Sequence, residues 1–403
     1  MSKKSFSRRK FFCDVAAGST GLALASLPGV LPAAASDTAP EPAFPVTVES
    51  YPVAEPSRGV GLARVKIATL DEIPESYQEQ LRGLSSSLEL RQCRAEEEFR
   101  REVVDAHVIY GEFSRKDFVA ANHLKWIQYT AAGVESILWP ELVESPVVLT
   151  NMQRIYSPAI SETVMGMLLA LTRGINRYAI QTREGRWKPI DGLTEISGLV
   201  MGIVGLGGIG TDTAYRAHYG FNMKVLAVDP KPLPKPAFVA ELHSLDWLPK
   251  MVPQADVLVS AAPHTKVSEG MFNEAVFRAM KPSAYFINVS RGKLVDTAGL
   301  VRALKEGWIA GAGLDVAHKE PLPPDDALWS AGNVIITSHS SGHSPRTLDR
   351  RMGLFTENVR RYVNGLPLLN VVKKGVLGPR GASQPRCPGF FTAKRHASRA
   401  VAS

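Results

Sequence analysis

The segment of this chain with the clearest chemical purpose is a glycine-rich turn that reads Gly-Leu-Gly-Gly-Ile-Gly. A hydrophobic, strand-like run precedes it and a helix-like run follows, which is the context in which this spacing binds a dinucleotide. The first glycine permits a tight turn, the second lets backbone N–H groups approach a pyrophosphate, and the last allows close packing of helix on strand. The cofactor contacts expected from this turn are Gly205, Gly207, Gly208, Ile209 and Gly210.

Asp229 ends the next strand-like run, 19 residues after Gly210. A carboxylate at this place accepts hydrogen bonds from the ribose hydroxyls of the adenosine half and repels a 2′-phosphate. The sequence therefore predicts NAD as the cofactor rather than NADP, although Lys231 lies close enough to reduce that preference. The alternative for the whole segment is a strand, turn and helix that bind nothing.

Three further short motifs follow Asp229 along the chain. They are Asn-Val-Ser-Arg-Gly at 288–292, Gly-Leu-Asp-Val at 313–316 with Glu320-Pro321, and Ser-His-Ser-Ser-Gly at 338–342. Together with the glycine turn they resemble the D-2-hydroxyacid dehydrogenase family, and residues 357–372 resemble its glyoxylate/hydroxypyruvate reductase branch. The resemblance covers about residues 61–372 and implies hydride transfer between a nicotinamide and C2 of a small 2-hydroxy or 2-oxo acid.

Such a reaction needs a base for the hydroxyl proton, a cation for the carboxylate or developing oxyanion, and groups that orient the substrate. The resemblance assigns the base to His339, which becomes the acid in the reducing direction, and makes Glu320 the partner of its imidazole. It assigns substrate binding to Arg291, whose planar fork matches a carboxylate. Spacing alone does not pair Glu320 with His339.

The resemblance also implies two backbone or cofactor contacts. Ala132 and Gly133 lie in a turn after a strand-like run and are expected to present N–H groups to the substrate carboxylate. Asp315 is expected near the carboxamide of the nicotinamide.

Each of these side chains has a less specific interpretation. Arg291 before a glycine is also typical of an exposed turn, and Glu320 is also an ordinary loop charge. His339 and His343 share the spacing of two metal ligands on a helix, but Gly342 and Pro345 disfavour a helix there and no third ligand stands out. We therefore expect no metal site.

Two other functions remain compatible with the same motifs. One is a related enzyme such as a phosphite dehydrogenase. The other is a non-catalytic NAD(H)-sensing binding protein that shares the fold.

Strand-like and helix-like runs alternate along the body of the chain, which predicts parallel sheets with helices on both faces. The expected fold is α/β, with two Rossmann-like, doubly wound domains and the NAD-binding domain inserted into a flavodoxin-like substrate domain. The substrate domain is expected at 61–152 and 343–372, and the NAD-binding domain at 153–342. A long apolar helix is expected over 157–178, and the resemblance implies that the protein is a homodimer.

The net charge of +8 invites a nucleic-acid interpretation, but the charge lies at the two ends of the 403 residues. Residues 1–35 carry +4, residues 371–403 carry +7, and the body between them carries −3. We therefore expect no nucleic-acid partner. The tail at 373–403 is expected to be disordered, and the proline-rich residues 36–60 are expected to form a linker.

Residues 1–35 have the features of an export signal. Arg8 and Arg9 precede Lys-Phe-Phe, an uncharged stretch follows, and small residues end at Ala35. The paired arginines resemble a twin-arginine signal, which predicts a periplasmic enzyme exported in folded form, without a membrane anchor once the signal is removed. If the segment is not a signal, the protein is cytoplasmic or is anchored by this stretch.

Overall fold

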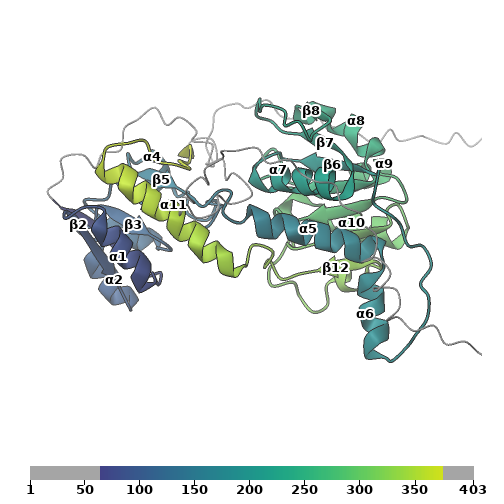
Figure 1. Cartoon of the computed structure of the whole chain (residues 1–403), viewed down its shortest axis with the longest axis horizontal. Helices are drawn as coiled ribbons and strands as arrows, with labels where there is room; N and C mark the ends of the chain where they lie inside the picture. The colour runs from purple at the N-terminus through teal and green to yellow at the C-terminus, as the bar shows by residue number, and fades with distance from the viewer. Residues whose placement is uncertain (1–63, 375–403) are drawn as a thin grey trace, which may run out of the picture. The chain divides into compact units, whose positions relative to one another are not determined.

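The computed structural model describes residues 64–374, so the expected signal segment, the linker and nearly all of the basic tail lie outside the described residues. The chain is an α/β protein with two sheets in which every strand pairing is parallel (Figure 1). Two such sheets confirm the expected fold class of two Rossmann-like units. None of the helices between residues 64 and 374 is both long and apolar enough to cross a bilayer.

The first sheet has five strands in the order β2-β1-β3-β4-β5. Four short helices connect these strands, and α11 returns from the far end of the described chain to pack against α1 (Figure 1). The strands are β1 Val65–Thr69, β2 Leu88–Gln92, β3 Val108–Tyr110, β4 Trp126–Gln128 and β5 Val148–Thr150. The helices are α1 Glu75–Gly83, α2 Glu96–Glu102, α3 Arg115–Ala120, α4 Pro140–Glu144 and α11 Pro345–Val363.

The second sheet has seven strands in the order β12-β11-β10-β9-β6-β7-β8. The strands are β6 Val200–Val204, β7 Lys224–Val228, β8 Glu241–His243, β9 Val257–Ser260, β10 Tyr285–Asn288, β11 Gly311–Leu314 and β12 Val334–Ile336. The α-helices are α5 Ser157–Thr172, α6 Ile175–Arg183, α7 Gly208–Tyr215, α8 Leu248–Met251, α9 Glu274–Ala279 and α10 Thr297–Lys305. The chain reverses direction across the sheet between β6 and β9, and parallel α/β sheets bind ligands beside the carboxyl ends of the strands at such a switch point.

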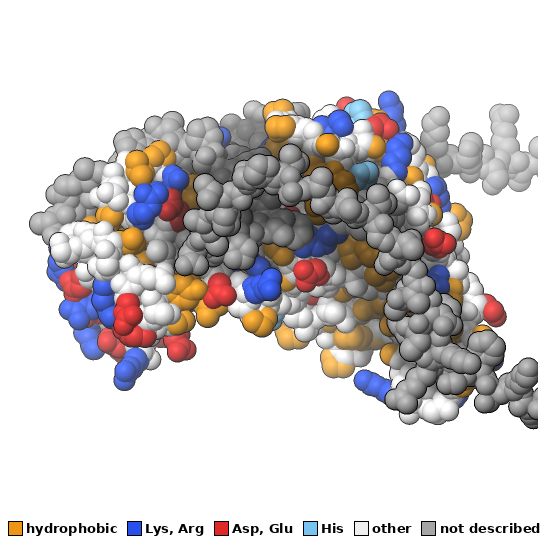
Figure 2. Space-filling model, viewed as in Figure 1, with side chains coloured by type: hydrophobic (Ala, Val, Ile, Leu, Met, Phe, Trp, Pro, Cys, Tyr) orange, Lys and Arg blue, Asp and Glu red, His pale blue; other side chains and the backbone are white. Residues whose placement is uncertain are grey.

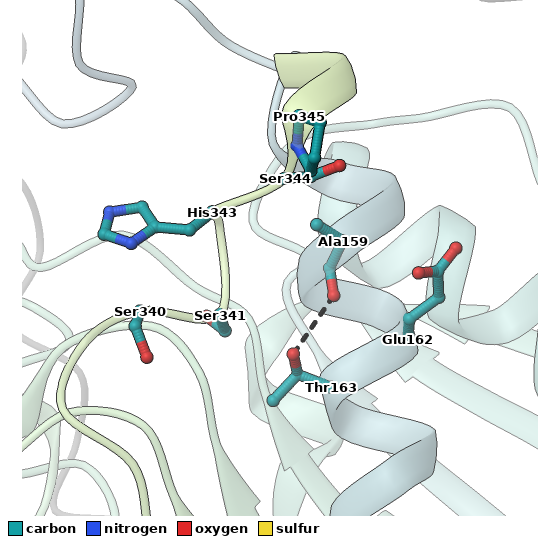
Figure 3. Close-up of a pocket in the computed structure, with 8 residues that line it drawn as sticks. All are labelled: Ala159, Glu162, Thr163, Ser340, Ser341, His343, Ser344 and Pro345. Atoms are coloured by element: carbon teal, nitrogen blue, oxygen red, sulfur yellow. Dashed lines mark hydrogen bonds between the residues drawn. The ribbon is translucent and has the colours of Figure 1, made fainter. Parts of the chain in front are cut away.

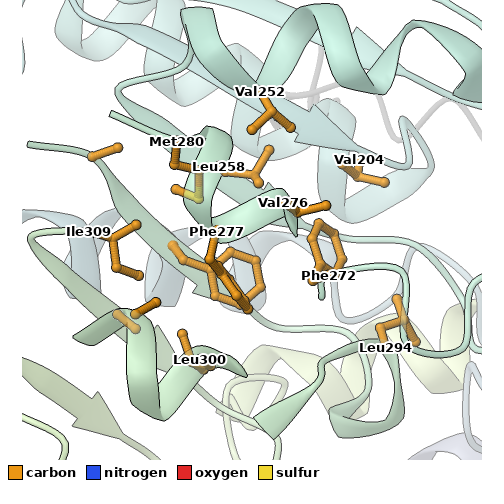
Figure 4. Close-up of a cluster of buried hydrophobic side chains, with 14 of the residues drawn as sticks. Val204, Val252, Leu258, Phe272, Val276, Phe277, Met280, Leu294, Leu300 and Ile309 are labelled. Atoms are coloured by element: carbon orange, nitrogen blue, oxygen red, sulfur yellow. The ribbon is translucent and has the colours of Figure 1, made fainter. Parts of the chain in front are cut away.

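Apolar side chains cover both faces of the second sheet. Alternate residues of one strand face opposite ways, so Met201 and Ile203 pack with α5 and α7 while Val204 packs with α8, α9 and α10. The cluster around Val204 contains three phenylalanines, Phe272, Phe277 and Phe286, and all three are fully buried. Figure 4 shows Phe272 and Phe277 among the other apolar side chains of this cluster. This buried layer fixes the strand ends that carry the glycine turn.

The observed elements differ from the expected ones in three places. The single helix expected over 157–178 is two helices, because Gly174 adopts φ +62° and ends the first. The helix expected after the glycine turn ends its α-helical part at Tyr215 and continues as one π-helical turn, Arg216–Gly220. The edge strands β2 and β8 were not expected, because their residues are only partly buried and largely polar.

Candidate active site

The glycine turn joins β6 to α7 at the switch point of the second sheet. Gly205 has φ +93° and donates its backbone N–H to the carbonyl of Val228 at 2.8 Å. A Cβ atom on Gly205 would lie 2.8 Å from the backbone nitrogen of Ala262, and one on Gly210 would lie 2.0 Å from the carbonyl oxygen of Gly205. Only glycine fits either position without moving the backbone.

Gly207 differs from its neighbours because a Cβ there would meet nothing within 4 Å. Its backbone therefore faces open space in front of the first turn of α7, as a cradle for a pyrophosphate requires. Gly208 has no room for a side chain, because an added Cβ would lie 2.5 Å from the Ser157 hydroxyl. Ile209 packs against the apolar cluster that contains Met201 and Ile203. The turn fits a dinucleotide.

Asp229 lies directly after β7 with its carboxylate beside this turn. One carboxylate oxygen accepts the backbone N–H of Leu206 at 2.8 Å, and the other accepts the backbone N–H of Lys231 at 2.9 Å. Asp229 is 9% exposed. The two hydrogen bonds hold the carboxylate at the turn, and the expected contact with the ribose hydroxyls of a dinucleotide stays a prediction.

The structure places His339 and Glu320 together. The imidazole Nδ1 lies 2.7 Å from Glu320 Oε2, and both side chains are partly exposed. His339 has φ +52°, an uncommon conformation for a residue other than glycine, and its backbone N–H donates to the carbonyl of Asp315 at 2.8 Å. Backbone strain of this kind is concentrated at functional sites.

The carboxylate of Asp315 organises the turn that carries His339. It accepts the Thr337 hydroxyl at 2.6 Å and the backbone N–H groups of Ser340 and Ser341 at 3.1 and 3.2 Å, and it also pairs with the Ser341 hydroxyl. Asp315 is 1% exposed. These contacts position the histidine, and the expected contact between Asp315 and the nicotinamide stays a prediction.

Arg291 lies against the turn that contains Gly133. A Cβ on Gly133 would lie 2.0 Å from Arg291 Nη2, so the guanidinium occupies the space beside this glycine. Nη1 donates to the carbonyl of Ser290 at 2.8 Å, and Nη2 lies 3.8 Å from a carboxylate oxygen of Glu135. The cation and the backbone expected to bind a substrate carboxylate are therefore adjacent.

The neighbouring Ala132 is exposed, and its carbonyl accepts the side-chain amide of Asn151 at 2.6 Å. The expected contact between the N–H groups of Ala132 and Gly133 and a substrate carboxylate stays a prediction. The sequence did not point to Glu135 or Asn151 as residues near the expected substrate site. Their partners lie far away in the chain, and only the order Ala-Gly-Val-Glu within the turn could have pointed to Glu135.

A cavity of about 420 Å³ lies between the first turns of α5 and the loop before α11 (Figure 3). Ser340 and Ser341, which follow His339, line it together with His343, Glu162 and Thr163. The Thr163 hydroxyl donates to the carbonyl of Ala159 at 3.1 Å, so it is occupied within its own helix. His339 does not line this cavity, which is adjacent to the pair of His339 and Glu320 rather than centred on it.

Comparison with known proteins identifies the family. Residues 165–341 match the NAD-binding domain of D-isomer specific 2-hydroxyacid dehydrogenases. A glyoxylate reductase of Korarchaeum cryptofilum is 34% identical over 280 residues, which cover 68% of this chain and 81% of that protein. The chain belongs to the D-isomer-specific 2-hydroxyacid dehydrogenase family. It is thus an NAD(P)-dependent oxidoreductase of 2-hydroxy acids.

Two solved structures of this family superpose on the dehydrogenase. A D-isomer specific 2-hydroxyacid dehydrogenase family protein from Aeromonas salmonicida has a TM-score of 0.69 and 30% identity, covering 78% of this chain and all of that one. An NADPH-dependent glyoxylate/hydroxypyruvate reductase from Sinorhizobium meliloti, in complex with citrate, has a TM-score of 0.65 and 26% identity, covering 77% and 98%.

Charges on the visible face of the dehydrogenase are mixed in sign. Figure 2 shows basic and acidic side chains interspersed over the region of α1 and α2, where Lys66 pairs with Glu102 at 2.7 Å and Arg82 pairs with Glu75 at 2.9 Å. Each of these two basic side chains therefore has an acidic partner nearby.

Proposed function

We propose that this dehydrogenase reduces a small 2-oxo acid of the glyoxylate or hydroxypyruvate type, with NADH as the preferred cofactor. The observation that carries the proposal is the 2.7 Å contact between His339 and Glu320 on a turn held by Asp315. A carboxylate that fixes one imidazole nitrogen leaves the other for the substrate oxygen. The names of the relatives support the substrate class.

In this mechanism Glu320 accepts the Nδ1–H of His339 and fixes its orientation. The protonated imidazole donates from Nε2 to the substrate carbonyl oxygen, which becomes the hydroxyl of the product. When bound, a reduced nicotinamide would supply the hydride that C2 of the 2-oxo acid receives. In the oxidising direction, neutral His339 takes the hydroxyl proton back.

Arg291 binds the substrate carboxylate in this proposal, and the backbone N–H groups of Ala132 and Gly133 contribute from the adjoining turn. The guanidinium already lies against Gly133, so both groups act on one anion. Charge-assisted hydrogen bonds to a carboxylate are about twice as strong as neutral ones. Arg291 also opposes the negative charge that develops on the carbonyl oxygen.

NAD preference rests on Asp229. Its carboxylate, held by two backbone N–H groups, meets a 2′-phosphate with like charge. The reductase from Sinorhizobium meliloti is NADPH-dependent, so the fold alone does not set the cofactor, and the Asp229 side chain is proposed to decide between NAD and NADP.

The remaining proposals concern the whole protein. Residues 61–152 with 343–372 are proposed as the substrate domain and 153–342 as the NAD-binding domain. A homodimer is supported by exposed apolar side chains along α6 and the segment after it: Ile175, Ile180, Trp187 and Leu193.

Residues 1–35 are proposed to direct export of the folded enzyme to the periplasm. Purified periplasmic protein should then begin near Ser36, and an intact N-terminus in the cytoplasm would reject export.

The test of function is NADH oxidation with glyoxylate, hydroxypyruvate, pyruvate and phenylpyruvate, repeated with NADPH. We expect turnover with glyoxylate and hydroxypyruvate and a higher kcat/KM with NADH than with NADPH. NADH binding without turnover of any acid would instead favour a non-catalytic NAD-sensing protein.

A further inference from the structure

The anion-binding place beside Arg291 already has a carboxylate of this chain next to it. Glu135 Oε2 lies 3.8 Å from Arg291 Nη2 and 2.6 Å from the position that a Cβ on Gly133 would occupy. The Arg291 Nη2 atom lies 2.0 Å from that same position. A cation, a carboxylate and the Gly133 backbone therefore meet within the space of one small group.

Glu135 does not anchor the arginine. The distance of 3.8 Å is an ion pair without a hydrogen bond, whereas Arg291 Nη1 is fixed by the carbonyl of Ser290 at 2.8 Å. Both charged side chains are about one third exposed, at 36% and 35%. A pair of this kind contributes little to folding, so the Glu135 carboxylate is free to move away when another anion arrives.

Glu112, another carboxylate in the loops of the first sheet, hydrogen-bonds to a different residue. Glu112 accepts the hydroxyl of Tyr129 at 3.1 Å. Among residues 64–374, Glu135 is the one carboxylate that forms an ion pair with Arg291.

We propose that Glu135 is a resident counter-ion of the substrate-binding arginine, which the carboxylate of the 2-oxo acid must displace. The side chain then sets substrate affinity by competition and by repulsion, and takes no part in proton or hydride transfer. This inference rests on the proposed role of Arg291, and it makes Glu135 a specificity-determining residue that weakens the binding of anionic substrates.

The experiment compares wild type with Glu135→Gln, which keeps the shape of the side chain and removes its charge. Glu141→Gln is the matched control, because Glu141 pairs with Arg115 away from Arg291. Two quantities are measured: KM and kcat for glyoxylate at saturating NADH, and the Kd of oxalate for the NADH-loaded enzyme by calorimetry. The second needs no turnover, so it separates a failure of this inference from a failure of the proposed function.

We expect Glu135→Gln to lower KM and the oxalate Kd about two- to fivefold, the range of a partly exposed ion pair, with kcat within twofold of wild type. High salt should reduce the difference, since exposed charges are screened. Glu141→Gln should leave both constants unchanged. An oxalate Kd that is unchanged or higher in Glu135→Gln would overturn the inference, because Glu135 would then be a bystander or an orienting group. Glu135→Ala provides the same comparison should the glutamine variant fold poorly.

Discussion

Two glycines of the same turn should fail in opposite ways when replaced by alanine. Gly205 has φ +93°, and its added Cβ would lie 2.8 Å from the backbone of Ala262. A left-handed conformation costs a non-glycine residue about 1–2 kcal/mol, and forcing a methyl group into packed backbone costs about 1–3 kcal/mol. We therefore expect Gly205→Ala to lose about 2–5 kcal/mol of unfolding free energy, a large part of the roughly 5–15 kcal/mol of a native protein.

Gly207→Ala should leave the unfolding free energy nearly unchanged and weaken NADH binding instead. Its φ of −72° suits alanine and the new methyl group meets no atom within 4 Å, so the unfolding free energy should change by less than about 1 kcal/mol. The methyl group nevertheless occupies the open side that the pyrophosphate needs, and a tenfold weaker NADH affinity corresponds to about 1.4 kcal/mol.

The assay is urea unfolding followed by circular dichroism, together with NADH titration by fluorescence, for both variants and wild type. A Gly205→Ala protein as stable as wild type would refute the steric argument. A Gly207→Ala protein with unchanged NADH affinity would refute the assignment of the turn as the pyrophosphate cradle.

Three further substitutions test individual side chains. Glu320→Gln should lower kcat at least about tenfold with NADH affinity unchanged, because the charged partner of His339 is lost; unchanged kcat would remove Glu320 from the mechanism. Asp315→Ala leaves buried N–H and hydroxyl donors without an acceptor, at roughly 1–3 kcal/mol for each unsatisfied group; urea unfolding should show at least about 2 kcal/mol lost, and wild-type stability would contradict this. Asp229→Ser should raise the kcat/KM ratio of NADPH to NADH at least about fivefold, equivalent to about 1 kcal/mol; a constant ratio would place cofactor choice elsewhere.

Local signals predicted the glycine turn between β6 and α7. Gly210 is required by a contact within one strand–turn–helix unit, with the carbonyl oxygen of Gly205, and the spacing of the motif marks that position. Gly205 is required by the backbone of Ala262 after the neighbouring strand β9, which no local signal reports. Apolar periodicity likewise predicted most strands of the second sheet. It failed at α5 and α6, where the apolar pattern runs on through Gly174 although the backbone does not.

Contacts between side chains that are distant in sequence could not be predicted from residue types and spacing alone. His339 and Glu320 are joined through a turn whose shape depends on the buried carboxylate of Asp315, and family resemblance rather than spacing suggested the pair. The contact between Arg291 and Glu135 joins side chains 156 positions apart, from loops of different sheets. No periodicity in the sequence reports such a contact.

The central claim is that His339 transfers the proton in an NAD-linked reduction of a 2-oxo acid. The most direct measurement is the rate of NADH oxidation by glyoxylate in His339→Ala, with NADH affinity measured on the same protein by fluorescence. We predict that turnover falls at least about 100-fold, the lower range for a general acid, while the NADH Kd stays within about twofold of wild type. Turnover close to wild type in a variant that binds NADH normally would contradict the account.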